Sequence, residues 1–342
     1  MKKNILDYSL MEIEKEMERL GEPRHRAKQI FLWIYHKNAD SFSKMTNIPK
    51  TFIEKLKSQF VITRVGCEEH LTSRDGTEKF LWKLKDEEYV ETVLIKEGPR
   101  RTVCISTQVG CKFKCPFCAS GQKRFKRDLT VSEIVDQLRM TADLSSSCVS
   151  NIVFMGMGEP LDNYDNLIKA IRIINMPEGL GLAARRITIS TCGIVPEIFR
   201  LKEEGLQIEL SVSLHAAEDK LRDVLVPVNR KYKIKELISA CLAYHQKTKR
   251  IITLEYILLR GQNDSAREAK KLARLAKKIK AKVNLINYSP IFSSDAAIVP
   301  VKDRLLFMSI LRENKVTVTV RKSKGSDILA ACGQLAAKIR KK

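Results

Sequence analysis

The sequence predicts an α/β fold built as an open, partial (β/α)6 barrel. After residue 101, six short apolar runs alternate with amphipathic helical patterns. Such alternation is typical of parallel strands joined by right-handed crossovers. Six units are too few to close an eight-stranded barrel, so we expect the barrel to stay open, with its site at the carboxyl ends of the strands. The predicted strands are residues 102–107, 151–155, 187–191, 208–213, 252–258 and 283–287.

The segments on either side of the barrel have other patterns. Apolar residues recur at helical spacing from residue 6 to residue 60, and two strand-like runs, 78–84 and 89–95, follow across a charged turn. After the barrel, residues 316–320 form a last predicted strand, and we expect a helix to follow it. We therefore divide the chain into a small helical N-terminal domain (1–62), a linking β-hairpin (63–100), the partial barrel (101–300) and a C-terminal strand-helix extension (301–342).

The chain carries a large excess of positive charge. Its 342 residues include 62 Lys and Arg against 40 Asp and Glu, a formal net charge of +22. The cations of residues 267–282 lie first of all on the polar face of an amphipathic helix, so no single run identifies a partner. The summed charge favours a polyanion, with nucleic acid as the first candidate.

The nine cysteines are not expected to form a disulfide framework. Their number is odd, and the first residues, Met-Lys-Lys-Asn-Ile-Leu-Asp-Tyr, have no apolar leader core, so the pattern favours a reducing cytoplasm. No run approaches the roughly 20 apolar residues of a membrane span. We expect a soluble, cytoplasmic monomer.

Three cysteines form a short run after the first barrel strand. Cys111, Cys115 and Cys118 have the spacing Cys-x3-Cys-x2-Cys and supply three thiolates. Thiolates hold iron–sulfur cubanes, and an iron without a protein ligand can bind a small molecule through nitrogen and oxygen. This arrangement is typical of radical S-adenosylmethionine enzymes, in which one electron cleaves the sulfonium to a 5'-deoxyadenosyl radical. A structural zinc site is the alternative, but the nearest further cysteine, Cys104, is seven residues upstream.

Polar residues follow several predicted strands. In the motif Met-Gly-Met-Gly-Glu-Pro, the glycines let the backbone approach a ligand, and Glu159 can accept from an ammonium group. Ser190, Ser213, His215 and Ser289 stand at the ends of three other strands. A single serine is most often structural, but several strand ends together favour a site.

These residues resemble the RlmN/Cfr family of radical S-adenosylmethionine RNA adenine methyltransferases, most closely its adenine-C2 branch. The resemblance runs from end to end. Its most diagnostic segment surrounds Cys332, because general radical enzymes share a three-cysteine run but lack this C-terminal cysteine. The segments that carry it are Cys104-Ile-Ser-Thr-Gln-Val-Gly-Cys-Lys-Phe-Lys-Cys-Pro-Phe-Cys, Phe154-Met-Gly-Met-Gly-Glu-Pro-Leu, Ser211-Val-Ser-Leu-His, Val226-Pro-Val-Asn, Glu255-Tyr-Ile-Leu and Asp327-Ile-Leu-Ala-Ala-Cys-Gly-Gln-Leu.

The resemblance implies which residues bind the two cofactors, a 4Fe-4S cluster and S-adenosylmethionine. Cys111, Cys115 and Cys118 would be the cluster ligands. Ser289 stands where the family often has Asn, so the chain departs from the family pattern at this cofactor contact. The other implied contacts of S-adenosylmethionine are Gly158, Glu159, Ser190, Ser213, Leu214 and His215.

The resemblance also implies a reaction. Cys332 would take a methyl group from one S-adenosylmethionine by displacement, since a thiolate is a good nucleophile. A radical from a second S-adenosylmethionine would activate that methyl group for addition to C2 of adenine, which is electron-poor. Cys104 would release the product by forming a disulfide with Cys332, and Glu91 would take a proton from the adduct.

The implied partners are RNAs and a reductant. The substrate would be an adenine of 23S ribosomal RNA, with transfer RNA as a further candidate, and residues 1–62 would contact RNA. A donor such as flavodoxin would supply electrons. Three alternatives stay open: methylation at C8, a radical enzyme that acts on a peptide or metabolite, and a zinc-stabilised RNA-binding protein.

Overall fold

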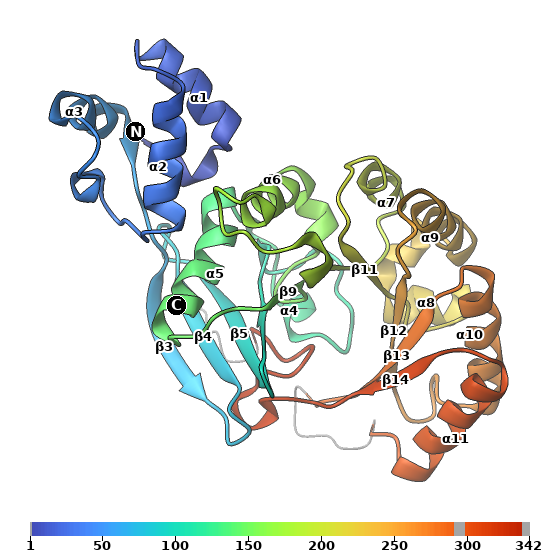
Figure 1. Ribbon diagram of the computed structural model, residues 1–342. Coiled ribbons are helices and arrows are strands. Elements are labelled where there is room, and N and C mark those ends of the chain that lie inside the picture. Colours follow the sequence, from blue (N-terminus) through green and yellow to red (C-terminus); the bar gives the residue numbers. More distant parts are fainter. Residues whose placement is uncertain (1, 291–297, 337–342) are drawn as a thin grey trace.

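The computed structural model describes residues 2–290 and 298–336 and is built around a ten-stranded sheet (Figure 1). Seven neighbouring parallel strands of this sheet form the wall of a partial barrel. In spatial order they are β6 (Arg100–Cys104), β9 (Asn151–Phe154), β10 (Ile187–Thr191), β11 (Glu209–Ser213), β12 (Thr253–Leu258), β13 (Lys282–Asn287) and β14 (Val318–Arg321). The predicted open barrel is confirmed, and its last predicted strand joins the sheet as a seventh parallel strand.

Helices cover the outer face of this curved sheet (Figure 1). Some of them begin at side-chain caps that the sequence supplies: Thr130 and Glu133 form a capping box at the first long barrel helix, and Ser265 accepts from the Glu268 amide at a later one. The barrel helices are α5 (Val131–Leu144), α6 (Tyr164–Asn175), α7 (Val195–Leu201), α8 (Asp219–Leu225), α9 (Ile234–Thr248), α10 (Ala266–Lys278) and α11 (Val301–Glu313).

An antiparallel extension continues the sheet beyond β6. It consists of β3 (Gly66–Thr72), β4 (Glu78–Lys83) and β5 (Tyr89–Glu97), each paired with the next, and β5 pairs with β6. The sequence predicts β4 and β5 but not β3. Since every residue of β3 except Leu71 is exposed, this edge strand lacks the apolar alternation that identifies a strand.

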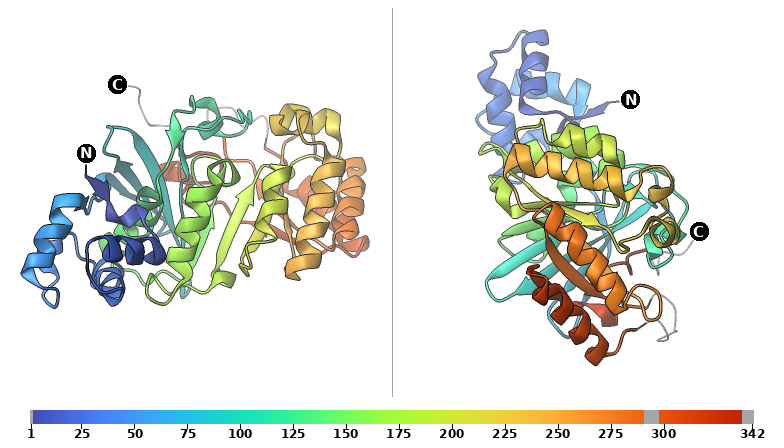
Figure 2. Two further views of the ribbon diagram at one scale, coloured as in Figure 1. Left: turned by 90° about the horizontal axis from the view of Figure 1, so that it is seen from above. Right: turned by 90° about the vertical axis from the view of Figure 1, so that its right-hand side faces the viewer.

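The N-terminal helices form a separate group at one end of the molecule (Figure 2). They are α1 (Leu10–Arg19), α2 (His25–Tyr35) and α3 (Lys50–Gln59), and the short strands β1 (Lys3–Asn4) and β2 (Phe60–Val61) pair beside them. The group is fastened to α5: the Ser132 amide donates to Asp7 at 2.8 Å, and Arg139 donates to the Ile34 carbonyl at 3.0 Å.

The helix predicted after the last strand is not present in residues 322–336, where the only helical turn is the 3-10 segment Ser326–Ile328. Four residues there have left-handed φ values, which cannot continue a right-handed helix: Gly325 (62°), Leu329 (53°), Gly333 (85°) and Ala336 (75°). Residues 337–342 lie outside the described residues. No helix in the described part of the chain is long and apolar enough to cross a membrane.

Candidate active site

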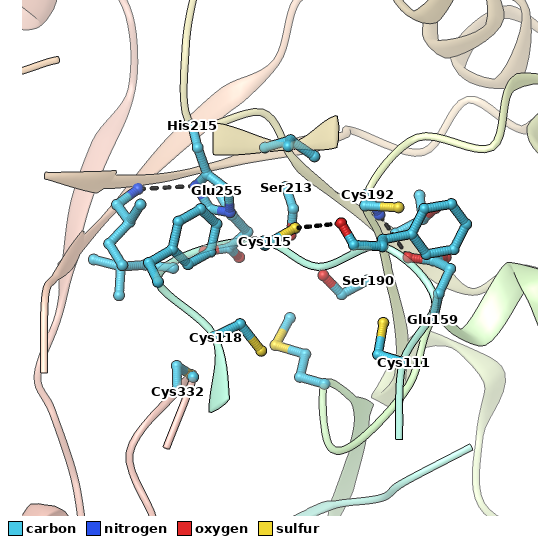
Figure 3. Close-up of a pocket in the computed structure, with 18 of the residues that line it drawn as sticks. Cys111, Cys115, Cys118, Glu159, Ser190, Cys192, Ser213, His215, Glu255 and Cys332 are labelled. Carbon is cyan, nitrogen blue, oxygen red and sulfur yellow. Dashed lines mark hydrogen bonds between the residues drawn. The ribbon is translucent and has the colours of Figure 1, made fainter. Parts of the chain in front are cut away.

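A cavity opens at the carboxyl ends of the barrel strands, where the sequence places the site (Figure 3). Its wall contains the cysteine run, residues that end or follow β9, β10 and β11, residues within β12 and β13, and the C-terminal segment around Cys332. Of the predicted residues, those that line this cavity are Cys111, Cys115, Cys118, Gly158, Glu159, Ser190, Ser213, His215 and Cys332.

The cysteine run lies in a loop that a two-stranded ladder closes. β7 (Gln108–Val109) pairs with β8 (Arg127–Asp128), and Gly110 between them has φ +77°, where a Cβ would come within 2.2 Å of the Arg124 carbonyl oxygen. The side chains of Cys111, Cys115 and Cys118 point from this loop toward one shared space (Figure 3). Burial raises the pKa of the Cys111 thiol to about 12, so the free thiols would remain protonated without a bound metal centre.

The donor set fits an iron–sulfur cubane better than a single ion. In the described part of the chain, no group of three or more His, Cys, Asp or Glu side chains is arranged to hold one metal ion. A zinc site would need its ligands within about 2.3 Å of a single centre. In a cubane the cysteines bind different irons and therefore stay apart. The three thiols alone leave one corner of such a cluster without a protein ligand.

The glycines of the Met-Gly-Met-Gly-Glu-Pro motif permit close packing of the backbone. A Cβ at Gly156 would lie 2.7 Å from the Ile105 backbone, and one at Gly158 would lie 2.5 Å from the Gln108 Cβ. The end of β9 is thereby held against the chain that leads into the cysteine loop. Both glycines also line the cavity.

The carboxylate of Glu159 is buried and already has two partners. It accepts from the Leu161 amide at 3.1 Å and from the Cys192 amide at 2.7 Å. Burial raises its pKa. Each carboxylate oxygen can accept more than one hydrogen bond, so the group can still receive an ammonium donor from the cavity.

His215 is held as a neutral imidazole. Its Nδ1 accepts from the Ile257 amide at 3.0 Å, and its ring meets Phe117 edge-on, with centroids 4.8 Å apart. Burial lowers the pKa of His215 to about 3. The remaining ring nitrogen is therefore a donor, available for a hydroxyl or carboxylate group of a ligand.

Four predicted residues do not line this cavity. Leu214 is fully buried and contributes its backbone, since its amide donates to the Glu255 carbonyl at 3.0 Å. Ser289 lines an adjoining cavity inside the barrel and lies 3.2 Å from Ser323, oxygen to oxygen. Cys104, in β6, and Glu91, in β5, are buried behind the wall.

All nine cysteines lie within the described residues and are free thiols. In this structure Cys104 and Cys332 are therefore not joined by the disulfide that the resemblance implies. Burial, together with the neighbouring Cys332, raises the pKa of the Cys104 thiol to about 12.

Sequence reasoning missed several residues of the wall. Phe113 and Phe117 alternate with the cluster cysteines, and Glu255 and Arg321 reach the cavity from β12 and β14. The aromatic residues within the cysteine run were a usable signal. A charged residue within an otherwise apolar strand, as at Glu255, was another, because a buried strand with a carboxylate needs a polar space to face.

Comparison with known proteins identifies the chemistry. Residues 105–275 match the radical SAM superfamily, and residues 3–62 match the ribosomal RNA large subunit methyltransferase N-terminal domain. The chain is 46% identical to the probable dual-specificity RNA methyltransferase RlmN of Thermotoga sp. (strain RQ2), over 97% of each chain. It is 43% identical to the protein of that name from Bacillus thuringiensis (strain Al Hakam), over 99% of this chain and 95% of the relative. The chain belongs to the RlmN family of radical SAM RNA methyltransferases.

A solved structure agrees with this assignment to the RlmN family. The radical SAM methyltransferase from Sphaerobacter thermophilus superimposes with a TM-score of 0.92 at 42% identity, over 98% of this chain and 100% of that one. The protein is thus a radical SAM RNA methyltransferase that uses a 4Fe-4S cluster and S-adenosylmethionine, as the sequence predicts. This excludes two alternatives, a zinc-stabilised RNA-binding protein and a radical enzyme that acts on a peptide or metabolite.

Proposed function

We propose that this RlmN-family enzyme methylates C2 of an adenine in 23S ribosomal RNA, with transfer RNA as a second substrate, through a methyl group carried on Cys332. The names of its relatives, dual-specificity RNA methyltransferases, support two RNA substrates. Cys111, Cys115 and Cys118 would hold the cluster, which together with S-adenosylmethionine would supply a radical.

The position of Cys332 is the observation that carries the proposal. Cys332 lines the same cavity as the cluster cysteines, beside Cys118 (Figure 3). The backbone fixes this placement, because the Ala119 amide donates to the Gly333 carbonyl oxygen at 2.7 Å. A thiol in this position lies within one cavity with the site for S-adenosylmethionine, so it can receive a methyl group there and hold it for the base.

The proposed contacts of S-adenosylmethionine are the polar strand ends. Glu159 would accept from its amino group, and Ser190, Ser213 and His215 would donate to its oxygens. Gly158 and Leu214 would contribute backbone, and Ser289 would act from the adjoining cavity. One acceptor for an ammonium group and several donors for carboxylate and ribose oxygens fit a zwitterionic ligand that carries a sugar.

Cys104 and Glu91 are proposed to complete the reaction. Cys104 would attack the Cys332 sulfur as the methylated base departs, so that one disulfide forms and the bond from sulfur to carbon breaks. Glu91 would accept a proton from the adduct. Both Glu91 oxygens already have a partner in the enzyme, Lys79 on one and the Ala336 amide on the other, so Glu91 would accept the proton on a remaining lone pair.

The RNA would present an unpaired adenine to the cavity. A base must leave its stack to reach a buried site, which favours a loop nucleotide over a duplex. The net charge of +22 supports phosphate binding around it. We propose that the helical domain (1–62) contacts RNA, that the hairpin (63–100) links it to the barrel (101–300), and that the extension (301–342) carries the methyl group.

We propose a cytoplasmic location for the enzyme. Free thiols and a reducible cluster need a reducing compartment, which supports a cytoplasmic enzyme. A small electron carrier such as flavodoxin would reduce the cluster. We propose that the enzyme acts as a monomer.

The test is mass analysis of RNA after anaerobic reaction with S-adenosylmethionine and a reductant. The proposal expects 2-methyladenine in 23S ribosomal RNA and in transfer RNA, and loss of the product in the Cys332→Ala protein with its cluster intact. A methyl group at C8 would contradict methylation at C2. Formation of the methylated product by the Cys332→Ala protein would contradict the role of Cys332 as the methyl carrier.

A further inference from the structure

Two oppositely charged side chains are buried together behind the cavity wall. Lys79 on β4 and Glu91 on β5 form an ion pair, with Nζ 3.1 Å from Oε1, and their side chains are 3% and 4% exposed. Lysine is rarely buried to this extent, because removing an ammonium and a carboxylate from water costs more than their attraction usually returns. An apolar pair would suit this part of a sheet better if stability were its only purpose.

Both members of the pair also bind the segment that carries Cys332. Lys79 Nζ donates to the carbonyl oxygen of Leu329 at 3.5 Å, three residues before the cysteine. Glu91 Oε2 accepts from the amide of Ala336 at 2.6 Å, four residues after it. The ion pair therefore holds the segment on either side of Cys332.

The turn before β4 provides a second anchor for this segment. Asp75 accepts from the Gly325 amide at 3.1 Å, and Asp327 accepts from the Ser73 hydroxyl at 2.6 Å. On the opposite side, the Ser120 hydroxyl of the cluster loop donates to the Leu335 carbonyl at 3.0 Å. The segment is thus enclosed between the antiparallel extension and the cluster loop, with Cys332 facing the cavity.

We propose that the Lys79–Glu91 pair is a clamp that holds residues 329–336 in place, and that Lys79 is a positioning residue for Cys332. The clamp as a structural contact does not depend on the proposed function. Only its link to catalysis rests on the proposed role of Cys332 as the methyl carrier. It gives Glu91 a second task beside the proposed proton transfer, namely holding the Ala336 amide.

The experiment compares hydrogen exchange of residues 329–336 in the cluster-loaded, full-length protein and its variants. Lys79→Met removes the cation but leaves Glu91 as a buried, unpaired carboxylate. The double variant Lys79→Met/Glu91→Leu is therefore also measured, because it removes both charges and leaves no buried, unpaired ion. Lys83→Met is the matched control, since Lys83 lies on the same strand and pairs with the exposed Glu87.

The clamp predicts that exchange in residues 329–336 becomes about tenfold faster in both Lys79 variants, as expected for the loss of one or two hydrogen bonds. Peptides from β9 to β12 should stay as in wild type, and Lys79→Arg should recover most of the protection. Alkylation of Cys332 by N-ethylmaleimide should accelerate in parallel, with the exposed Cys67 as an internal reference for the reagent.

If hydrogen exchange and alkylation in the double variant are no faster than in Lys83→Met, the clamp is overturned. Equal acceleration in the β9 to β12 peptides would also overturn it, because the pair would then only stabilise the fold. Failure of the proposed function gives a different result: Cys332→Ala would still methylate RNA while Lys79 still protected residues 329–336.

Discussion

The guanidinium of Arg222 donates a hydrogen bond to the carbonyl oxygen of Cys192 at 2.6 Å. It also donates to the carbonyl oxygens of Leu214 and Ser213, each at 3.1 Å, and to Asn229 Oδ1 at 2.9 Å. Because Cys192 follows β10 and Ser213 ends β11, one buried cation fixes two neighbouring strand ends of the cavity. The Val-Pro-Val-Asn motif of the sequence is explained by Asn229, which orients this cation.

Arg222→Met should therefore destabilise the protein strongly. It leaves several buried acceptors without a donor, and each such acceptor typically costs about 1–3 kcal/mol in the free energy of unfolding. Urea unfolding measures the effect, with Arg230→Met on the exposed surface as control. A loss no greater than that of the control would contradict the assigned role.

Gly158→Ala should cost more stability than Gly181→Ala, although both glycines have positive φ. Gly181 has φ +64° and open space around it, so alanine there pays only the backbone penalty of about 1–2 kcal/mol. Gly158 has φ +93°, and its new Cβ would lie 2.5 Å from Gln108 Cβ. Unfolding free energies of the two variants test this order, and equal values would show that Gln108 moves aside freely.

His215 should make the enzyme less stable as the pH falls from about 6.5 toward 3. Burial lowers its pKa from 6.5 to about 3, so in this range the unfolded chain binds a proton that the folded chain does not. Its contribution is complete above pH 6.5 and is lost on acidification, by up to about 1.4 kcal/mol per pH unit.

The pH effect is measured as the difference between wild type and His215→Gln, from urea unfolding between pH 4.5 and 7. Glu159 and Glu255, whose pKa values are raised by burial, act in the opposite direction and cancel in this difference. Parallel stability curves for the two proteins would refute the prediction.

Cys104→Ala should trap the enzyme on its RNA. Without the second thiol, the bond between Cys332 and the methylated base has no partner to break it, so a covalent complex should accumulate. A denaturing gel with labelled RNA detects the complex, and Cys67→Ala serves as the exposed-cysteine control. Normal turnover by the Cys104→Ala protein would show that Cys104 does not take part in product release.

The sequence predicts the barrel and the cysteine run well because both depend on local patterns. Strand–helix alternation and the Cys-x3-Cys-x2-Cys spacing are each visible within short windows. The edge strand β3 was missed because its exposed residues carry no alternation. The expected C-terminal helix was wrong through residue 336, because non-glycine residues such as Leu329 adopt positive φ there, which no propensity predicts.

The contacts that complete the site depend on distant pairs and could not be predicted from patterns. Lys79 reads as an ordinary charged strand residue until the fold places it against Glu91 and Leu329. Arg222 likewise reads as a helix surface cation, yet it is fully buried. Ser289 was expected beside the other cofactor contacts, but it lines the adjoining cavity.

The most direct test of the central claim follows the methyl group through Cys332. Enzyme whose Cys332 carries an unlabelled methyl group is mixed anaerobically with RNA, a reductant and S-adenosylmethionine labelled with deuterium in its methyl group, and the first turnover is analysed by mass. The account predicts that the first adenine product carries no deuterium, because its new carbon comes from the unlabelled Cys332 methyl group after the radical has removed one hydrogen, and that deuterated product appears only in later turnovers. A deuterated methyl group on RNA in the first turnover would contradict it.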